Sequence, residues 1–273
     1  MSAVRKIDPI YYLVRALLVA GAVASVFPFI WMVVGMTLNP NDVVRGVLRP
    51  GNEFALNWQK MNKNYAVFSF FLNSASVAVA TVLGGLAVNS FAAFGFEKYK
   101  SKARDRIFDI LLVSMIVPQM AIVIPLFREI AFFKLLDTRA AIVLPSVMSV
   151  FIVFFMRQNF RMFPTEIMDA ARVDGAAEPA IFLRVVLPSM KASFASAGIY
   201  MFLAQWNAYL WPLMTILSDA KKTLPIVMSS MMRAYTIEYG GLMIVVCVST
   251  FPVLVLFLAM QRQFVAGLLG SVK

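Results

Sequence analysis

Six apolar stretches run along the chain, and the polar segments between them carry most of its charge. The stretches cover residues 16–41, 64–96, 110–127, 139–157, 191–219 and 238–262. A helix needs about 20 apolar residues to cross the hydrocarbon core of a bilayer, and all six stretches lie close to or above that length. Pro118 and Pro125 interrupt the third stretch. The pattern predicts an all-α membrane protein with six transmembrane helices, organised as a single membrane domain over residues 1–273.

The composition agrees with a lipid-facing exterior. Hydrophobic residues make up 61% of the chain and charged residues 14%, which leaves too few polar side chains for a surface in water. The net charge is +11. The basic residues lie in short clusters between apolar stretches, as in membrane-protein loops, and this argues against nucleic-acid binding. The first stretch is too long for a removable signal peptide and lacks the usual cleavage site.

The positive charges predict the orientation in the membrane. Of the 25 Lys and Arg residues, 15 lie in the N-terminal tail, the 97–106 loop, the 157–191 segment and the C-terminal tail, and ten lie in the alternate loops. Cytoplasmic loops carry an excess of Lys and Arg. Both termini are therefore expected in the cytoplasm.

Several kinds of chemistry lack the residues that they require. The chain has no histidine and a single cysteine, Cys247, which excludes histidine-based catalysis, histidine metal sites and an intrachain disulfide. No GxxxxGK[ST] motif is present, so the chain does not bind nucleotide through a P-loop. Acidic residues are nearly absent from the apolar stretches, and Asp109 is expected at a solvated helix end. We expect no catalytic site, no metal and no cofactor in this chain.

The near-absence of buried acidic residues favours a transporter whose energy is supplied from outside the chain, and two alternatives to it remain. A secondary carrier or channel normally uses buried charges or repeated spans, and a membrane-bound enzyme needs a catalytic constellation. The sequence offers little for either.

Residues 157–191 are too long for a simple turn and too regularly patterned for a linker. Pro164 and Thr165 mark a helix start, with Thr165 as the expected N-cap, and Gly175 suits the left-handed residue that follows a helix. Pro179 fits the first turn of a second helix, and Pro188 ends it before the fifth span. The segment is predicted to form a helix, a tight turn and a second helix.

The first of these helices has a weakly apolar face. Ile167, Ala170, Ala171 and Asp174 fall on it by helical spacing. Such a pair of helices fits either an interfacial position on the lipid headgroups or a docking element for a cytosolic protein. The residues by themselves leave both interpretations open.

The stretch DAARVDGAAEPAIFLRVVLP, residues 169–188, resembles the EAA loop of ABC importer permeases. That pattern is Glu-Ala-Ala, three residues, Gly, nine residues, Ile, one residue, Leu-Pro. The residues that match in register are Ala170, Ala171, Gly175, Leu187 and Pro188. Asp169 stands where Glu is usual, and Val185 where Ile is usual.

Other stretches extend the resemblance over most of the chain. WNAYLWPL, residues 206–213, resembles the fifth span of carbohydrate importers of the maltose type. NSFAAFGFEKYK resembles the end of their second span, the spacing of Pro118 and Pro125 their third, and QRQFVAGLLGSVK their C-terminal tail.

The resemblance implies the type I ABC importer permease fold in a multi-pass protein of a bacterial inner (plasma) membrane. It implies a heteromeric importer that contains a second permease subunit, two ATPase subunits and an extracytoplasmic solute-binding protein, with ATP and Mg bound by the ATPases. The substrate would be a mono-, di- or oligosaccharide, with glycerol phosphate as the alternative. The residues expected to couple to an ATPase are Asp169, Ala170, Ala171, Asp174, Gly175, Leu187 and Pro188.

Polar and aromatic groups concentrate on the fifth apolar stretch. They are Gln205, Trp206, Asn207, Tyr209 and Trp211. Aromatic faces and amides suit a sugar, so these residues form the expected substrate path. Tyr and Trp are also enriched at membrane interfaces, and Asn often joins helices to one another, so positional and packing roles remain open.

Overall fold

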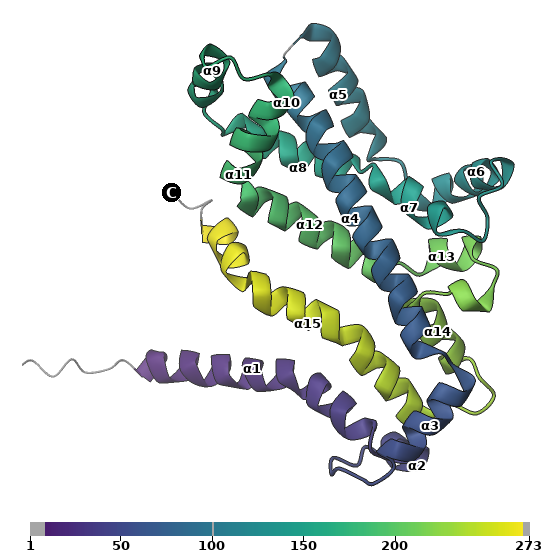
Figure 1. Ribbon diagram of the computed structural model, residues 1–273. Helices are drawn as coiled ribbons and strands as arrows, with labels where there is room; N and C mark the ends of the chain where they lie inside the picture. Colours follow the sequence, from purple (N-terminus) through teal and green to yellow (C-terminus); the bar gives the residue numbers. More distant parts are fainter. Residues whose placement is uncertain (1–8, 100, 270–273) are drawn as a thin grey trace, which may run out of the picture. The chain divides into compact units, whose positions relative to one another are not determined.

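The computed structural model describes residues 9–99 and 101–269, and these form helices joined by short loops (Figure 1). Arg5, Lys6 and the end of the C-terminal tail lie outside the described residues. The α-helices are α1 (Pro9–Gly35), α2 (Pro40–Val44), α3 (Phe54–Asn64), α4 (Val67–Lys98), α5 (Lys102–Ser114), α6 (Gln119–Phe132), α7 (Arg139–Val147), α8 (Val150–Arg161), α9 (Thr165–Val173), α10 (Glu178–Ile181), α11 (Leu187–Ser189), α12 (Lys191–Trp206), α13 (Leu210–Thr215), α14 (Leu224–Met232) and α15 (Tyr239–Leu269). A π-helical turn (Phe182–Val186) links α10 to α11, and a 3-10 turn covers Asp219–Lys221.

Three helices are long and apolar enough to cross a membrane unbroken, within residues 10–35, 67–98 and 239–261. Three further pairs of helices pass the same test together but bend sharply at a short break. The described residues therefore contain six candidate spans when each bent pair is counted as one. The orientation of the termini stays a prediction from the charge distribution.

The third predicted span is broken between α5 and α6, which meet at 105°. Helix α5 ends at Ser114, and α6 begins directly after Pro118, whose backbone is extended. Proline cannot donate a backbone hydrogen bond and forces the preceding residue away from helical geometry. Pro125, which was also expected to interrupt this span, lies inside α6 without ending it.

The fourth and fifth predicted spans are also discontinuous. Helices α7 and α8 meet at 41° around Met148 and Ser149. The stretch predicted as a fifth span over residues 191–219 forms α12, a break at residues 207–209, and α13. Apolar composition marks where the chain enters lipid, but it does not specify a straight helix.

The chain divides into two compact units, of which residues 1–67 and 228–251 form the first. Within that unit, Asn57 Nδ2 donates hydrogen bonds to the carbonyl oxygens of Met36 and Leu38, at 3.0 and 2.8 Å. A Cβ atom on Gly240 would lie 2.2 Å from the same nitrogen, so this glycine permits the close approach of α15 to α3. The assignment of residues 1–273 to a single domain stays a prediction.

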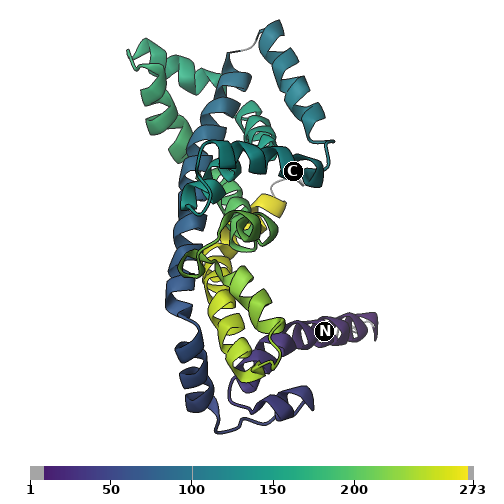
Figure 2. The same ribbon diagram turned by 90° about the vertical axis from the view of Figure 1, so that its right-hand side faces the viewer.

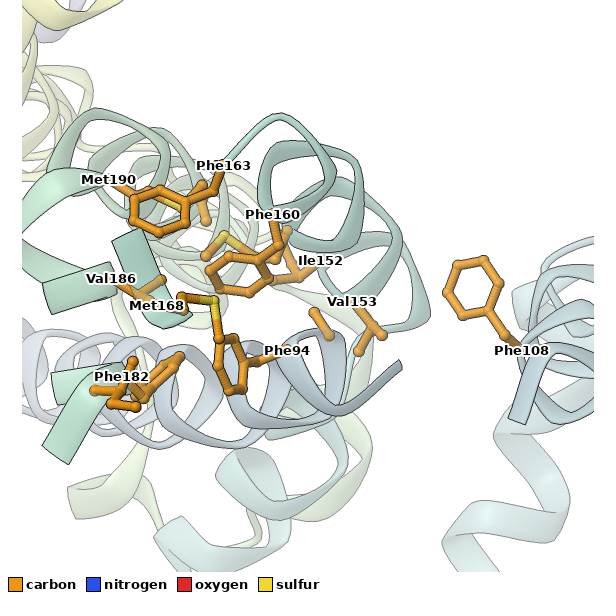
Figure 3. Packing of buried hydrophobic residues seen from close by; sticks show 14 of the residues in the cluster. Phe94, Phe108, Ile152, Val153, Phe160, Phe163, Met168, Phe182, Val186 and Met190 are labelled. Carbon is orange, nitrogen blue, oxygen red and sulfur yellow. The ribbon is translucent and has the colours of Figure 1, made fainter. Parts of the chain in front are cut away.

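Residues 68–227 and 252–273 form the second unit, whose core holds the patterned 157–191 segment against three helices. Phe182 in the π-helical turn lies 5.1 Å from the ring of Phe94 on α4 and 6.3 Å from that of Phe160 on α8. Phe194 on α12 lies 6.3 Å from Phe182. Figure 3 shows α4, α8 and the π-helical turn contributing side chains to one buried cluster. In Figure 1 and Figure 2 the α9–α10 pair lies beside the C-terminal end of α4.

A buried asparagine fixes the break between α7 and α8 against α4. Asn89 donates to the carbonyl oxygens of Gly85 and Val147 at 2.6 and 2.7 Å, and its Oδ1 accepts from Ser149 N at 2.8 Å. Its side chain is fully buried. It therefore pairs backbone groups that the helix break leaves without partners inside the helix.

Candidate functional site

The 157–191 segment folds as the helix–turn–helix that its residues predict, with one difference at its start and another at its end. Helix α9 begins at Thr165, so that residue is the first helical residue, whereas the N-cap position is occupied by Pro164 and has no side-chain capping bond. Gly175 has φ +81°, the left-handed conformation that glycine tolerates best. Its amide donates to Arg172 O at 3.0 Å and the amide of Ala176 to Ala171 O at 3.0 Å, which closes the turn.

Arg172 braces this turn from one side. Its guanidinium bonds Asp169 on the same helix at 2.5 Å and Glu178 at the start of α10 at 2.7 Å. The hydrogen bond from Arg172, followed by one from Tyr99, lowers the pKa of Glu178 below its ordinary value. Desolvation and the same carboxylate raise the pKa of the Tyr99 phenol. The brace joins Asp169, one of the predicted coupling residues, to the beginning of the second helix.

Helix α9 has an inner and an outer apolar surface. Met168 is 0% exposed, and Figure 3 shows its side chain pointing toward the rings of Phe94 and Phe160. Ala171 packs partly buried against the same cluster. On the outer surface Ile167 is 46% exposed and Val173 is 88% exposed. The predicted face thus divides, because Ala171 turns inward whereas Ile167, Ala170 and Asp174 are exposed.

The second half of the segment turns sharply into the next span. The stretch Glu178–Ser189 meets α12 at 84°. Pro188 was expected to end the second helix, but it lies in the first turn of α11, where its missing backbone donor is tolerated, and the helix ends at Ser189. Leu187 packs partly buried against the core. The predicted coupling residues therefore lie along one continuous structure that combines an exposed turn with a firmly packed base.

A separate cavity of about 510 Å³ lies among α4, α6, α7, α12 and α13. Three of the predicted substrate-path residues line it, namely Gln205, Tyr209 and Trp211. Trp211 Nε1 also donates to Ala141 O at 2.9 Å, which fixes the indole in the wall. The described residues that line this cavity include no charged side chain.

The other two predicted residues lie outside this lining. Trp206 is 3% exposed, and its ring packs against Phe202 at 5.4 Å and Phe71 at 5.8 Å. Asn207 is exposed, and its Nδ2 donates to Leu203 O at 2.9 Å, one turn back at the end of α12. Trp206 therefore packs against other aromatic rings, and Asn207 bonds the end of its own helix; neither residue lines the cavity.

Sequence reasoning missed a cluster of charged side chains around the buried Glu97, and it missed Tyr200, an aromatic residue of the cavity. Glu97 on α4 is buried and accepts from Arg157 Nε at 3.2 Å, while Arg157 Nη2 donates to Asp105 at 2.9 Å. Opposite charges at the ends of two spans were the available signal. Tyr200 lines the cavity from α12. Its position on the fifth apolar stretch was visible in the sequence, but only the tertiary structure places it on the cavity wall.

Among the residues that the structure describes, no group of three His, Cys, Asp or Glu side chains is placed to hold a metal ion. Two arrangements remain as candidate functional sites. One is the exposed helix–turn–helix held by the ion pairs of Arg172, and the other is the cavity beside α12, whose described lining residues are uncharged.

Known proteins are similar to this chain in sequence and in fold. Residues 85–269 match the family described as binding-protein-dependent transport system inner membrane component. The chain is 42% identical over 266 residues to the lactose transport system permease protein LacG of Rhizobium radiobacter. The aligned residues cover 97% of this chain and 96% of LacG. It is 30% identical over 269 residues to the sn-glycerol-3-phosphate transport system permease protein UgpE of Escherichia coli, with 95% and 96% covered.

A solved structure matches over nearly the whole length. A chain in the crystal structure of a bacterial ABC transporter involved in the import of the acidic polysaccharide alginate superposes with a TM-score of 0.82 at 19% identity, covering 96% of this chain and 99% of that one. This likeness confirms the predicted fold, that of a type I ABC importer permease. The matched family region includes the 157–191 segment, α12 and the whole of α15. The chain belongs to the binding-protein-dependent transport system inner membrane component family, and it is a non-catalytic permease subunit of the inner membrane.

Proposed function

We propose that this chain is the permease subunit of an ATP-driven importer that moves a neutral mono-, di- or oligosaccharide into the cytoplasm. The uncharged lining of the cavity beside α12 is the observation that carries the choice of substrate class. The 42% identity to the lactose permease LacG over nearly the full chain makes lactose the first sugar to test.

Glycerol phosphate is the second candidate, because UgpE is also similar over nearly the whole chain. A phosphate group is normally bound by Arg, Lys or several backbone N–H groups. The cavity offers amides, hydroxyl groups and aromatic rings, among them Gln119, Gln205, Ser146 and Tyr209. These groups bind a sugar without the cost of removing an unpaired anion from water.

Within this proposal, the substrate path narrows to Gln205, Tyr209 and Trp211. These three line the cavity, whereas Trp206 is packed between aromatic rings and Asn207 is exposed at the helix end. Amide and hydroxyl groups donate and accept hydrogen bonds, as sugar hydroxyls require.

The same proposal assigns coupling to the 157–191 segment. Its turn at Asp174 and Gly175 is exposed, and its base is packed into the core that joins α4, α8 and α12. A partner ATPase that holds the exposed turn would thereby move these helices together, since tightly packed elements shift as rigid bodies. We propose as partners two ATPase subunits that bind ATP and Mg, a second permease subunit and an extracytoplasmic solute-binding protein.

The test is uptake by the complete complex in proteoliposomes. We expect ATP-dependent uptake of radiolabelled lactose, or of another sugar in a panel, and none of sn-glycerol 3-phosphate. Tyr209→Ala should reduce sugar uptake, whereas Asn207→Ala, outside the cavity, should leave it unchanged. Uptake of sn-glycerol 3-phosphate without any sugar would establish the second candidate instead.

A further inference from the structure

Tyr200 is an aromatic side chain on the cavity wall that the predicted substrate path does not include. It lies on α12, and Ala204 and Ala208 follow it at four-residue spacing. All three residues line the cavity. Because alanine side chains extend little beyond the helix backbone, the face beyond Tyr200 is left open for a ligand.

The ring of Tyr200 is held in place from behind. The phenyl ring of Phe151 on α8 lies 4.7 Å from it, with an angle of 37° between the two planes. The side chain of Tyr200 is nevertheless 49% exposed. A ring that is supported on one side and open on the other loses little conformational freedom when a ligand binds, which favours binding.

The chemistry of the surrounding wall selects the kind of ligand. An aromatic face carries negative electrostatic potential and attracts the weakly positive C–H hydrogens on one face of a pyranose ring. Gln119 and Gln205 supply amide donors and acceptors on the same wall. This wall has no charged side chain among the described residues, so it favours a neutral ring that is apolar on its face and polar on its edge.

We propose that Tyr200 is a stacking platform for a pyranose ring of the transported sugar, an inference that rests on the proposed function. The phenyl ring of Phe151 orients the platform, and Gln205 lies within the same cavity as a hydrogen-bonding group. The stacking face, rather than the phenolic hydroxyl, provides the interaction.

The experiment compares Tyr200→Leu and Tyr200→Phe in the complete complex, reconstituted in proteoliposomes with lactose and a panel of other pyranosides. Tyr200→Leu removes the ring and should lower uptake per ATP hydrolysed about tenfold, in line with the contribution of an aromatic face. Tyr200→Phe keeps the ring and should stay within about twofold of the wild type. Tyr235→Leu, at a fully exposed tyrosine outside the cavity, is the matched control and should leave uptake unchanged.

Assembly is measured in the same preparations. Each variant should purify with the same ATPase and second permease content as the wild type, and its basal ATP hydrolysis should be preserved. Loss of partners in Tyr200→Leu would make Tyr200 an assembly residue and overturn the inference. Equal losses in Tyr200→Leu and Tyr200→Phe would overturn it too, because they would assign the effect to the hydroxyl.

The failure of the platform and that of the proposed function give different results. If the wild-type complex takes up a pyranoside and Tyr200→Leu does so equally well, the platform is refuted and the proposed function stands. If the wild-type complex takes up none of the sugars, the proposed function is refuted, and the inference that rests on it with it.

Discussion

Arg172 and Glu178 face each other across the turn that joins α9 to α10, with Arg172 Nε 2.7 Å from Oε1 of Glu178. A second contact, from Arg172 to the other carboxylate oxygen at 3.4 Å, makes the pair two-pronged. Both side chains are more than a third exposed, so the pair contributes little to global stability. Its effect is local, because it fixes the angle at which the exposed turn leaves the packed base.

Reversing one charge of this pair should loosen the turn without unfolding the protein. Arg172→Glu or Glu178→Arg should reduce ATPase association while changing global stability by less than about 1 kcal/mol, as is usual for exposed pairs. The double exchange restores opposite charges and should recover part of the association. Co-purification of the ATPase measures its association with the chain. Association equal to that of the wild type in both single variants would contradict a role for the pair.

The carboxylate of Glu178 predicts a dependence on pH. Its pKa in the folded chain lies below the ordinary value of 4.5, chiefly because of the hydrogen bond from Arg172. The folded form therefore binds the proton more weakly than the unfolded form, so the stabilisation is present above pH 4.5 and is lost as the pH falls through the lowered pKa. Amide exchange at residues 174–177, corrected for intrinsic rates, should lose protection on acidification. Glu178→Gln should remove this dependence.

Gly175 should tolerate only residues that accept its backbone conformation. An added Cβ meets no atom within 4 Å, but the φ of +81° is strained for most side chains. We expect Gly175→Val to cost about 1–2 kcal/mol locally and to abolish coupled transport. Gly175→Asn, which tolerates left-handed geometry, should retain the turn. Full coupled transport by Gly175→Val would refute the coupling assignment. Loss of transport in both variants would indicate that a partner occupies the space into which any side chain at this position extends.

Asn89→Leu should destabilise the second compact unit. The change leaves Val147 O and the Ser149 amide without their side-chain partner at the α7–α8 break. Unpaired buried polar groups of this kind cost about 1–3 kcal/mol each. Thermal unfolding in detergent measures the loss, with the exposed Asn64→Leu as the control. A melting temperature for Asn89→Leu equal to that of the control would show that the break is held by other contacts.

Gly85→Ala should be destabilising because α4 approaches its neighbours closely at this residue. A Cβ there would lie 1.9 Å from Met201 Cε and 3.1 Å from Val147 O. Overpacking of this kind costs about 1–3 kcal/mol. In the double variant with Met201→Ala, the loss should be smaller than the sum of the two single losses, because the methyl groups no longer compete for one space. Gly21→Ala, at a position with no atom within 4 Å of the added Cβ, should be neutral or slightly stabilising.

The local structure of the 157–191 segment was largely predictable from its own residues. Gly175 after a short amphipathic run and Pro179 at the start of the next helix determine the turn, because both act through their own backbone dihedral angles. The face of α9 was predictable only in part. Helical spacing grouped Ile167 with Ala171, but the position of the hydrophobic core decides that Met168 and Ala171 point inward.

The cavity residues were harder to separate. Gln205, Trp206, Asn207, Tyr209 and Trp211 are adjacent in sequence and chemically similar, so composition assigned all five to the substrate path. In the structure Trp206, the last residue of α12, packs against the ring of Phe202, whereas Gln205, Tyr209 and Trp211 line the cavity. Tyr200 joins them from nearly two turns before the break, and only the fold brings it there.

The sequence by itself determined that this chain lies in a membrane, lacks histidine and a P-loop motif, and has a helix–turn–helix between its fourth and fifth apolar stretches. These properties follow from composition, from missing residue types and from local backbone preferences. The tertiary structure decided where the spans break, which face of α9 is exposed and which aromatic residues surround the cavity. These depend on contacts between residues far apart in the sequence, such as Asn89 with Val147 and Phe151 with Tyr200, which no local pattern specifies.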